Sequence, residues 1–102
     1  MNSQSKGTVK EDFVSVVLPV FNEEESLPIL TTKIMEAMST CAQEYEIIYV
    51  DDGSQDGSAQ VIKDLAEKHG PVIGVILRRN FGQSAATAAG IDCAMGDIIV
   101  IM

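Results

Sequence analysis

Two adjacent carboxylates stand where an apolar run of the sequence ends in a turn. The run 46–50 leads directly into Asp51 and Asp52, which are followed by Gly53 and Ser54. At the carboxyl end of a strand, such side chains face the edge of an open α/β sheet where ligands bind. They could accept hydrogen bonds from a nucleobase or a ribose hydroxyl, bind a cation, or only cap the following turn and helix. The residue types alone leave these roles open.

Further polar side chains follow two other apolar runs. Asn22 and Glu23 come after the first run, and Arg78 and Arg79 come after the third. The arginines could bind phosphate oxygens through paired hydrogen bonds, or could be solvated surface charges. If the runs are parallel strands, all these side chains gather at one edge of the sheet.

The elements that must position these residues alternate between apolar runs and amphipathic segments. Because helices of this length join parallel strands through right-handed crossovers, we predict an α/β, Rossmann-like, doubly wound and mainly parallel sheet. The expected order across the sheet is third, second, first and fourth strand. We expect strands at 13–20, 46–50, 72–77 and 97–102, and helices at 26–43, 58–69 and 84–95.

Small residues set two further expectations. The alanine-rich segment 84–95 should let its helix lie close to the sheet. Cys41 and Cys93 are far apart in the sequence and lack the spacing of a metal site. We expect both to be small buried thiols on the apolar sides of their helices.

Composition and missing motifs exclude several classes of function. A net charge of −8 with only seven Lys and Arg residues argues against a nucleic-acid-binding surface. The sequence lacks the glycine-rich dinucleotide motif, the P-loop and the nucleophile elbow of α/β-hydrolases. It also lacks a signal-peptide core and an apolar run long enough to span a bilayer. We therefore expect a soluble, cytoplasmic chain.

The two ends of the chain lead to expectations about domain organisation. Residues 1–12 are polar and are predicted to form a flexible lead-in. The last apolar run stops at Met102, without the loop that normally follows a parallel strand. We expect 13–102 to be a truncated domain, and its exposed run 97–102 to favour self-association into a homo-oligomer.

Three motifs in order resemble the family 2 glycosyltransferases. They are VSVVLPVFNEE at 14–24, YVDDGS at 49–54 with DGS at 56–58, and RNFGQ at 79–83. The first two are similar to the N-terminal half of this family. The third resembles the branch that loads sugars onto polyprenyl phosphates, such as dolichyl-phosphate mannose synthase. The resemblance implies the N-terminal nucleotide-binding half of a GT-A fold.

The resemblance also implies residues that bind a nucleotide-sugar donor. The segment at the end of the first strand would hold the base and ribose, and Asp52, ahead of Asp51, would contact the base. Arg79 would touch either the base or the diphosphate. The implied nucleotide-binding residues are Pro19, Phe21, Glu23, Val50, Asp51, Asp52 and Arg79.

For the parent protein, the resemblance implies transfer of a hexosyl unit from a UDP- or GDP-sugar to a lipid-phosphate acceptor, at the cytoplasmic face of a membrane. The family's Asp-x-Asp motif, which holds Mg²⁺ or Mn²⁺, would follow the last strand, beyond Met102. We therefore expect no metal ligands and no catalytic residues in this fragment, and no activity from it alone.

Two alternatives stay open at this point. Paired aspartates at a strand end also occur in receiver-like phosphoacceptor signalling domains, which bind Mg²⁺. Here the pair follows the second strand and no aspartate ends the third, so only analogy of fold supports this class. The other alternative is a non-catalytic, self-associating fragment.

Overall fold

The computed structural model describes residues 12–41 and 44–102. Within these ranges, parallel strands form a four-stranded sheet of order β3-β2-β1-β4, which confirms the predicted class and strand order. Apart from Asp12, the expected lead-in lies outside the described residues, as do residues 42–43. The elements are β1 Phe13–Val20, α1 Leu27–Cys41, β2 Glu44–Asp51, α2 Ser58–Lys68, β3 Val72–Ile76, α3 Gln83–Cys93 and β4 Ile98–Ile101.

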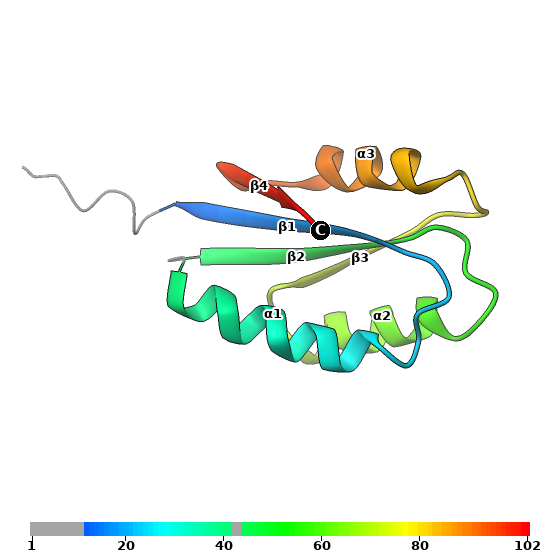
Figure 1. Cartoon of the computed structure of the whole chain (residues 1–102), viewed down its shortest axis with the longest axis horizontal. Helices are drawn as coiled ribbons and strands as arrows, with labels where there is room; N and C mark the ends of the chain where they lie inside the picture. The colour runs from blue at the N-terminus through cyan, green and yellow to red at the C-terminus, as the bar shows by residue number, and fades with distance from the viewer. Residues whose placement is uncertain (1–11, 42–43) are drawn as a thin grey trace, which may run out of the picture.

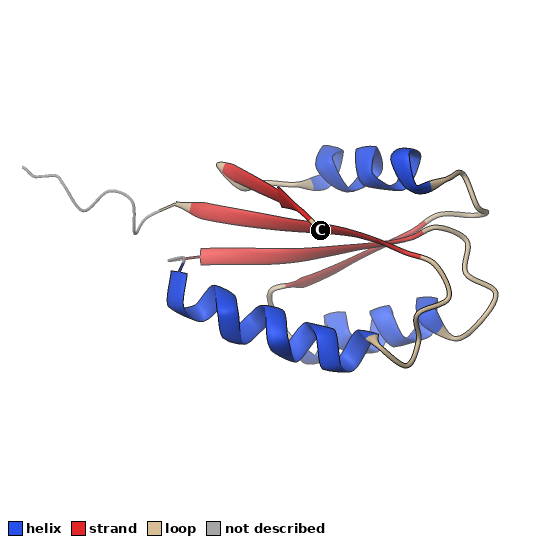
Figure 2. Ribbon diagram, viewed as in Figure 1, coloured by secondary structure: helices blue, strands red, loops and turns tan. Residues whose placement is uncertain are grey.

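Helices cover both faces of the sheet. Figures 1 and 2 show α1 and α2 on one face and α3 on the other. The larger apolar cluster lies between the sheet and helices α1 and α2, and the smaller one, Val17, Ile48, Val50 and Ala86, lies between the sheet and α3. Because both faces are covered, β1 and β2 are apolar along most of their length instead of alternating.

The close approach of α3 to the sheet is confirmed. A Cβ built on Gly90 would lie 2.5 Å from Cγ1 of Val17 and 3.0 Å from Cγ2 of Val50, so only glycine fits there. Ala86, one turn earlier, is fully buried. The small residues therefore bring the helix backbone against β1 and β2.

The prediction of buried thiols is wrong, since Cys41 and Cys93 are both exposed. Each cysteine is the last residue of its helix. No residue of α1 after Ile34 is buried, and no residue of α3 after Gly90 is buried. The C-terminal end of each helix therefore extends beyond the surface against which the helix packs. Helical periodicity identifies the apolar stripe, but does not show where the neighbouring element ends.

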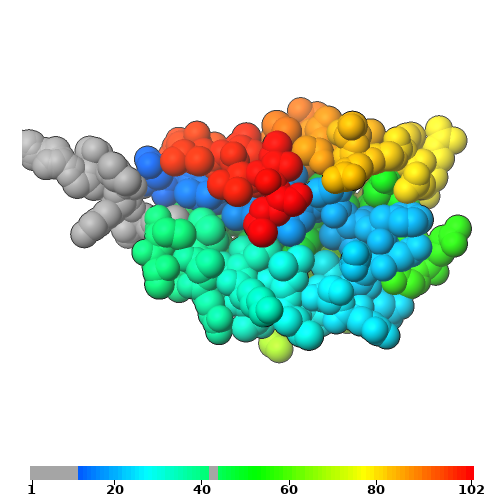
Figure 3. All heavy atoms as spheres, in the orientation of Figure 1, coloured from blue at the N-terminus to red at the C-terminus, as the bar shows by residue number. Residues whose placement is uncertain are grey.

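Strand β4 lies at the edge of the sheet and is exposed throughout. It pairs with β1 from Val14↔Ile98 to Val17↔Ile101. Figure 3 shows its segment, in red, on the molecular surface. The expectation of an exposed apolar strand is confirmed.

In the part of the chain that the structure describes, no helix is both long and apolar enough to cross a membrane.

A buried carboxylate ties the loop after α3 to the sheet. Oε2 of Glu46 accepts a hydrogen bond from Oγ of Ser15 at 2.6 Å and another from the backbone N–H of Met95 at 2.8 Å. The N–H of Gly96 donates to Oγ of Ser15 at 2.8 Å. These bonds fix the backbone that leads into β4.

Candidate functional site

The loops after β1, β2 and β3 gather at the carboxyl ends of the strands (Figure 1). The N–H of Asp52 donates to the carbonyl of Val20 at 2.8 Å, and the N–H of Leu77 donates to that of Asp51 at 2.9 Å. The predicted convergence of polar residues at one edge of the sheet is therefore confirmed.

Asn22 joins the β1–α1 loop to the β2–α2 loop. Its backbone has a φ of 54°, in the left-handed region that asparagine tolerates better than most residues. Its Oδ1 accepts from the N–H groups of Gln55 at 2.8 Å and Asp56 at 3.3 Å, and its own N–H donates to Oγ of Ser54 at 2.8 Å. The two loops thus form one connected unit.

Asp56, rather than the Asp51-Asp52 pair, accepts the first backbone N–H of α2, whose N-cap residue is Gly57. Oδ1 of Asp56 accepts from the N–H of Ser58 at 2.9 Å, at the start of the helix, and its Oδ2 accepts from the N–H of Glu24 at 3.3 Å. Glu24 accepts in return from the N–H of Gly57 at 3.0 Å. The hydrogen bonding with Ser58 is the main cause that lowers the pKa of Asp56.

Asp51 and Asp52 have different surroundings although they are adjacent. Oδ2 of Asp51 accepts from the N–H of Ser54 at 3.1 Å, which closes the turn, and its buried Oδ1 has no hydrogen-bond partner among the described residues. The carboxylate of Asp52 is turned to the β3–α3 loop, where it accepts from the N–H groups of Phe81 at 2.8 Å and Gly82 at 3.1 Å.

The glycine of this turn lets the β3–α3 loop lie directly on it. Gly53 has a φ of +72°, and a Cβ there would lie 2.3 Å from the carbonyl carbon of Arg79 and 2.4 Å from the nitrogen of Asn80. Any side chain at this position would collide with backbone. The Asp-Asp-Gly sequence therefore acts as a platform for the loop that leads into α3.

A cleft of about 240 Å³ lies between the β1–α1 loop and the start of α3. Its aromatic, carboxylate and amide groups suit a ligand with a flat ring and hydrogen-bond donors. Four residues expected from the sequence line it. Val20 and Gln83 line it too, although the predicted site omitted both and the motifs at 14–24 and 79–83 contain them. The lining is Pro19, Val20, Phe21, Glu23, Asp52 and Gln83.

The other three expected residues do not line this cleft. Val50 is fully buried under α3, and Asp51 is 2% exposed. Arg79 lies on the β3–α3 loop with its guanidinium carbon 4.8 Å from the centre of the Phe81 ring. The structure thus brings a subset of the predicted residues together and leaves the others next to it.

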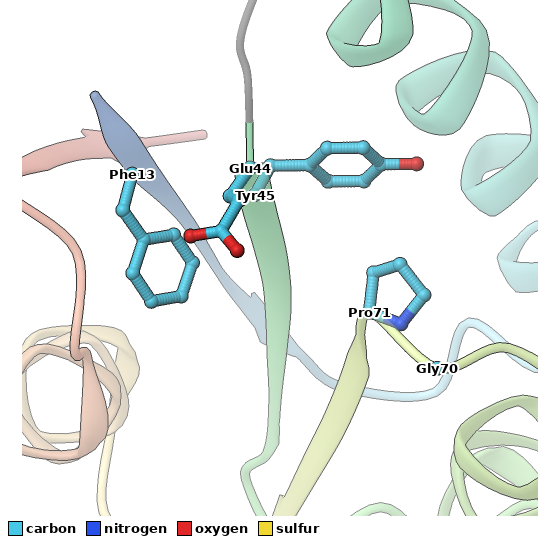
Figure 4. Close-up of a pocket in the computed structure, with 5 residues that line it drawn as sticks. All are labelled: Phe13, Glu44, Tyr45, Gly70 and Pro71. Atoms are coloured by element: carbon cyan, nitrogen blue, oxygen red, sulfur yellow. The ribbon is translucent and has the colours of Figure 1, made fainter. Parts of the chain in front are cut away.

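A second hollow at the same edge, about 230 Å³, is lined by carboxylates and other polar groups of the β1–α1 and β2–α2 loops and has no aromatic ring in its lining. A cavity at the opposite ends of the strands, about 430 Å³, is lined by Phe13, Glu44, Tyr45, Gly70 and Pro71 (Figure 4). It lies far from the converging loops. Over residues 12–41 and 44–102, no three histidine, cysteine or acidic side chains are grouped so that they could hold a metal ion.

Comparison with known proteins gives a consistent match over most of the chain. The model of the family described as glycosyl transferase family 2 matches residues 15–102. Two curated relatives are undecaprenyl-phosphate 4-deoxy-4-formamido-L-arabinose transferases, from Aeromonas hydrophila subsp. hydrophila, 48% identical, and Pseudomonas fluorescens, 50% identical. Each alignment covers 87% of this chain but only 28% and 26% of the respective relative.

One solved structure supports the fold. The mannosyltransferase PcManGT from Pyrobaculum calidifontis, in complex with GDP-Man and Mn²⁺, superposes with a TM-score of 0.73 at 23% identity. The match covers 87% of this chain and 26% of that one. This likeness supports the arrangement of strands and helices.

Proposed function

Since the chain belongs to glycosyl transferase family 2, we propose that it forms the donor-binding part of an enzyme that transfers a glycosyl unit from a nucleoside-diphosphate sugar to a polyprenyl phosphate. The cleft at the carboxyl ends of β1 and β2 carries this proposal. The transferred sugar can be the hexose expected from the sequence or an arabinose derivative such as the one in the relatives' names. Membership of this family replaces the receiver-like alternative.

We assign the donor's nucleoside to this cleft. The half-exposed ring of Phe21 offers a face on which a nucleobase can stack. Glu23 and Asp52 offer carboxylates that accept hydrogen bonds from base N–H groups or ribose hydroxyls. Pro19 borders the same cleft. These features favour a nucleoside without distinguishing UDP from GDP.

The remaining donor residues would act from outside the cleft. Val50 and Asp51 are buried in the strand that delivers Asp52, and would support its position. Arg79 carries the charge that suits a diphosphate, because its guanidinium can pair with two phosphate oxygens. We retain all three as proposed donor-site residues.

We propose that the metal ligands and the acceptor site belong to other parts of the enzyme. The solved relative is in complex with Mn²⁺, and a divalent cation, Mg²⁺ or Mn²⁺, would offset the charge of a departing nucleoside diphosphate. The described residues do not fit such an ion, since they offer no ligand cluster. The 102-residue chain alone should therefore not transfer sugar.

Two further expectations stay predictions. A lipid-bound acceptor would place the whole enzyme at a membrane, and we propose the cytoplasmic face. The exposed edge of β4 would favour homo-oligomers of the isolated chain. Size-exclusion chromatography over a range of concentrations tests the second expectation, which fails if the chain elutes as a monomer throughout.

Nucleotide titration of the isotope-labelled chain tests donor binding. UDP and GDP are added separately, and we expect one of them to shift the amide resonances of cleft residues and of the β3–α3 loop. Phe21→Ala should weaken this binding about tenfold. Ile29→Ala is the matched control, because Ile29 is 63% exposed on α1 and does not line the cleft. The proposal fails if millimolar concentrations of both nucleotides leave the cleft resonances unchanged.

The acceptor class needs a separate assay. A longer protein that joins this chain to the rest of the family domain is incubated with radiolabelled nucleotide sugars. Undecaprenyl phosphate and a soluble sugar acceptor are offered in parallel. We expect label in the lipid fraction only, and transfer only to the soluble acceptor would refute the polyprenyl-phosphate assignment.

A further inference from the structure

The carboxylate of Asp52 is occupied by the β3–α3 loop. Oδ1 accepts from the N–H of Phe81, and Oδ2 accepts from the N–H of Gly82 and, at 3.2 Å, from Nδ2 of Asn80. Nδ2 of Asn80 also donates to the backbone carbonyl of Asp52 at 3.1 Å. Asp52 is only 4% exposed. It both borders the cleft and binds the backbone of this loop.

The same loop carries an arginine on an aromatic ring. The guanidinium carbon of Arg79 lies 4.8 Å from the centre of the Phe81 ring, within the range of a cation–π contact. The backbone N–H of Phe81 is a donor to Asp52 at 2.8 Å. A continuous chain of contacts therefore runs from the Asp52 carboxylate through Phe81 to the Arg79 guanidinium.

Charge makes the position of this arginine important. The three loops at this edge carry the carboxylates of Glu23, Glu24, Glu25, Asp52 and Asp56, and their basic residues are Arg78 and Arg79. A nucleoside diphosphate is itself an anion and would be repelled by the acidic side chains. Its binding depends on where these arginines are held.

We propose that Asp52 is a positioning residue for Arg79: through the backbone and ring of Phe81, its carboxylate fixes the guanidinium for contact with the nucleoside-diphosphate donor. This inference rests on the proposed donor-binding function. It gives Asp52 a second task besides bordering the cleft, and it adds Phe81 and Asn80 to the residues on which donor affinity depends.

A measurement without ligand tests the positional part. Protons of the Arg79 side chain that lie over the Phe81 ring are shifted upfield by the ring current. We expect Asp52→Asn to return them to unstructured values, because an amide cannot accept from all the same N–H groups. Phe81→Leu should do the same while keeping the backbone N–H and its bond to Asp52. Unchanged Arg79 resonances in Asp52→Asn would overturn the proposal.

A double-mutant cycle on nucleotide affinity tests the functional part. We expect Arg79→Ala to weaken binding of UDP or GDP about tenfold in the otherwise unchanged chain, and by less than about twofold in Asp52→Asn. Asp64→Asn is the control background, because this exposed carboxylate on α2 accepts a hydrogen bond from Nε2 of Gln60 and lies outside the cleft. There, Arg79→Ala should keep its tenfold effect.

The outcomes separate this inference from the donor proposal. If Arg79→Ala has the same effect with and without Asp52→Asn, the positioning role is refuted, while donor binding stands. If neither UDP nor GDP binds the unchanged chain, the donor proposal fails, and the ring-current measurement still decides whether Asp52 places Arg79. If Asp52→Asn does not fold, Asp52→Glu takes its place in the ring-current measurement and in the cycle, because the longer side chain keeps the charge but moves its oxygens away from the N–H groups of Phe81 and Gly82. The same loss of the Arg79 effect is expected.

Discussion

Helix α3 is held at both ends by buried carboxylates that accept backbone N–H groups. At its start, Asp52 accepts from Phe81 and Gly82, and after its end Glu46 accepts from Met95. The hydrogen bonds have similar lengths, and both carboxylates are about 95% removed from solvent, with exposures of 4% and 5%. At the start, the carboxylate also offsets the positive end of the helix dipole.

The difference lies in what surrounds each carboxylate. Asp52 borders the cleft, whereas the side-chain partner of Glu46 is the buried hydroxyl of Ser15. We therefore expect the hydrogen bonds at the start of α3 to affect both the candidate site and stability, and those after its end to affect stability alone. Substitutions at the two ends should separate donor affinity from the free energy of unfolding.

The largest effect should come from the platform under the start of α3. Gly53→Ala combines a positive φ with a Cβ that collides with the backbone of Arg79 and Asn80, and should lower the free energy of unfolding by about 4 kcal/mol. Urea denaturation followed by circular dichroism measures the loss. Gly70→Ala is the control, because a Cβ there meets no atom within 4 Å and its cost should stay below about 0.5 kcal/mol. Equal costs at the two glycines would contradict the platform.

Removing the carboxylate that binds the loop after α3 should lower the free energy of unfolding almost as much. Glu46→Ala leaves the hydroxyl of Ser15 and the N–H of Met95 buried without their acceptor, and should cost about 3 kcal/mol. Glu44→Ala, an exposed carboxylate on the same strand, should change stability by less than about 0.5 kcal/mol. Nucleotide affinity of the folded protein, measured by titration, should not change in Glu46→Ala. A loss of affinity there would erase the distinction between the two ends.

A smaller change at the same end isolates one hydrogen bond. Ser15→Ala removes the donor to Glu46 and the acceptor for Gly96, but leaves Met95 bonded, and should cost about 1 kcal/mol. Thermal unfolding measures it against Ser39→Ala, whose hydroxyl is exposed on α1. A cost as large as that of Glu46→Ala would show that the serine, not the carboxylate, holds this loop.

The smallest effect on stability should come from Asp56, an exposed carboxylate that accepts hydrogen bonds from backbone N–H groups. The pKa of Asp56 is lowered in the folded chain, so its stabilising contribution is present above the ordinary pKa of 3.8 and is lost as the pH falls through the folded value. Asp56→Asn should therefore lower stability at about pH 6 and leave it nearly unchanged at about pH 2. Urea denaturation at both values checks this, and a pH-independent difference would exclude the carboxylate charge as the cause.

Much of this fold follows from local patterns. Continuous apolar runs predicted β1 and β3 to within a residue, and the alternation with helices gave the parallel order β3-β2-β1-β4. The convergence of Asn22, Asp52 and Arg79 at one edge followed from the parallel direction of the strands. These properties depend on patterns within short segments of the sequence and on the general preference of parallel strands for right-handed crossovers.

The orientations of individual side chains could not be predicted in the same way. Asp52 turns to amides that lie 28 to 30 positions away, and Asp56, rather than the Asp51-Asp52 pair, accepts the first backbone N–H of α2. Cys93 is exposed because of where the packing of α3 ends. Each outcome depends on distances between elements, and no local pattern of residues encodes those distances.

The bonds of Asn22 have a consequence for how β1 and β2 are aligned. Both strands are buried on both faces, so they lack the alternation of apolar and polar residues that normally specifies register. A slip of one residue would move the strands by about 3.3 Å and would break the contact from Gln55 to Asn22, which spans 33 positions. The loop contacts at the ligand edge therefore help to specify the register of β1 and β2, and in this register the binding groups lie together.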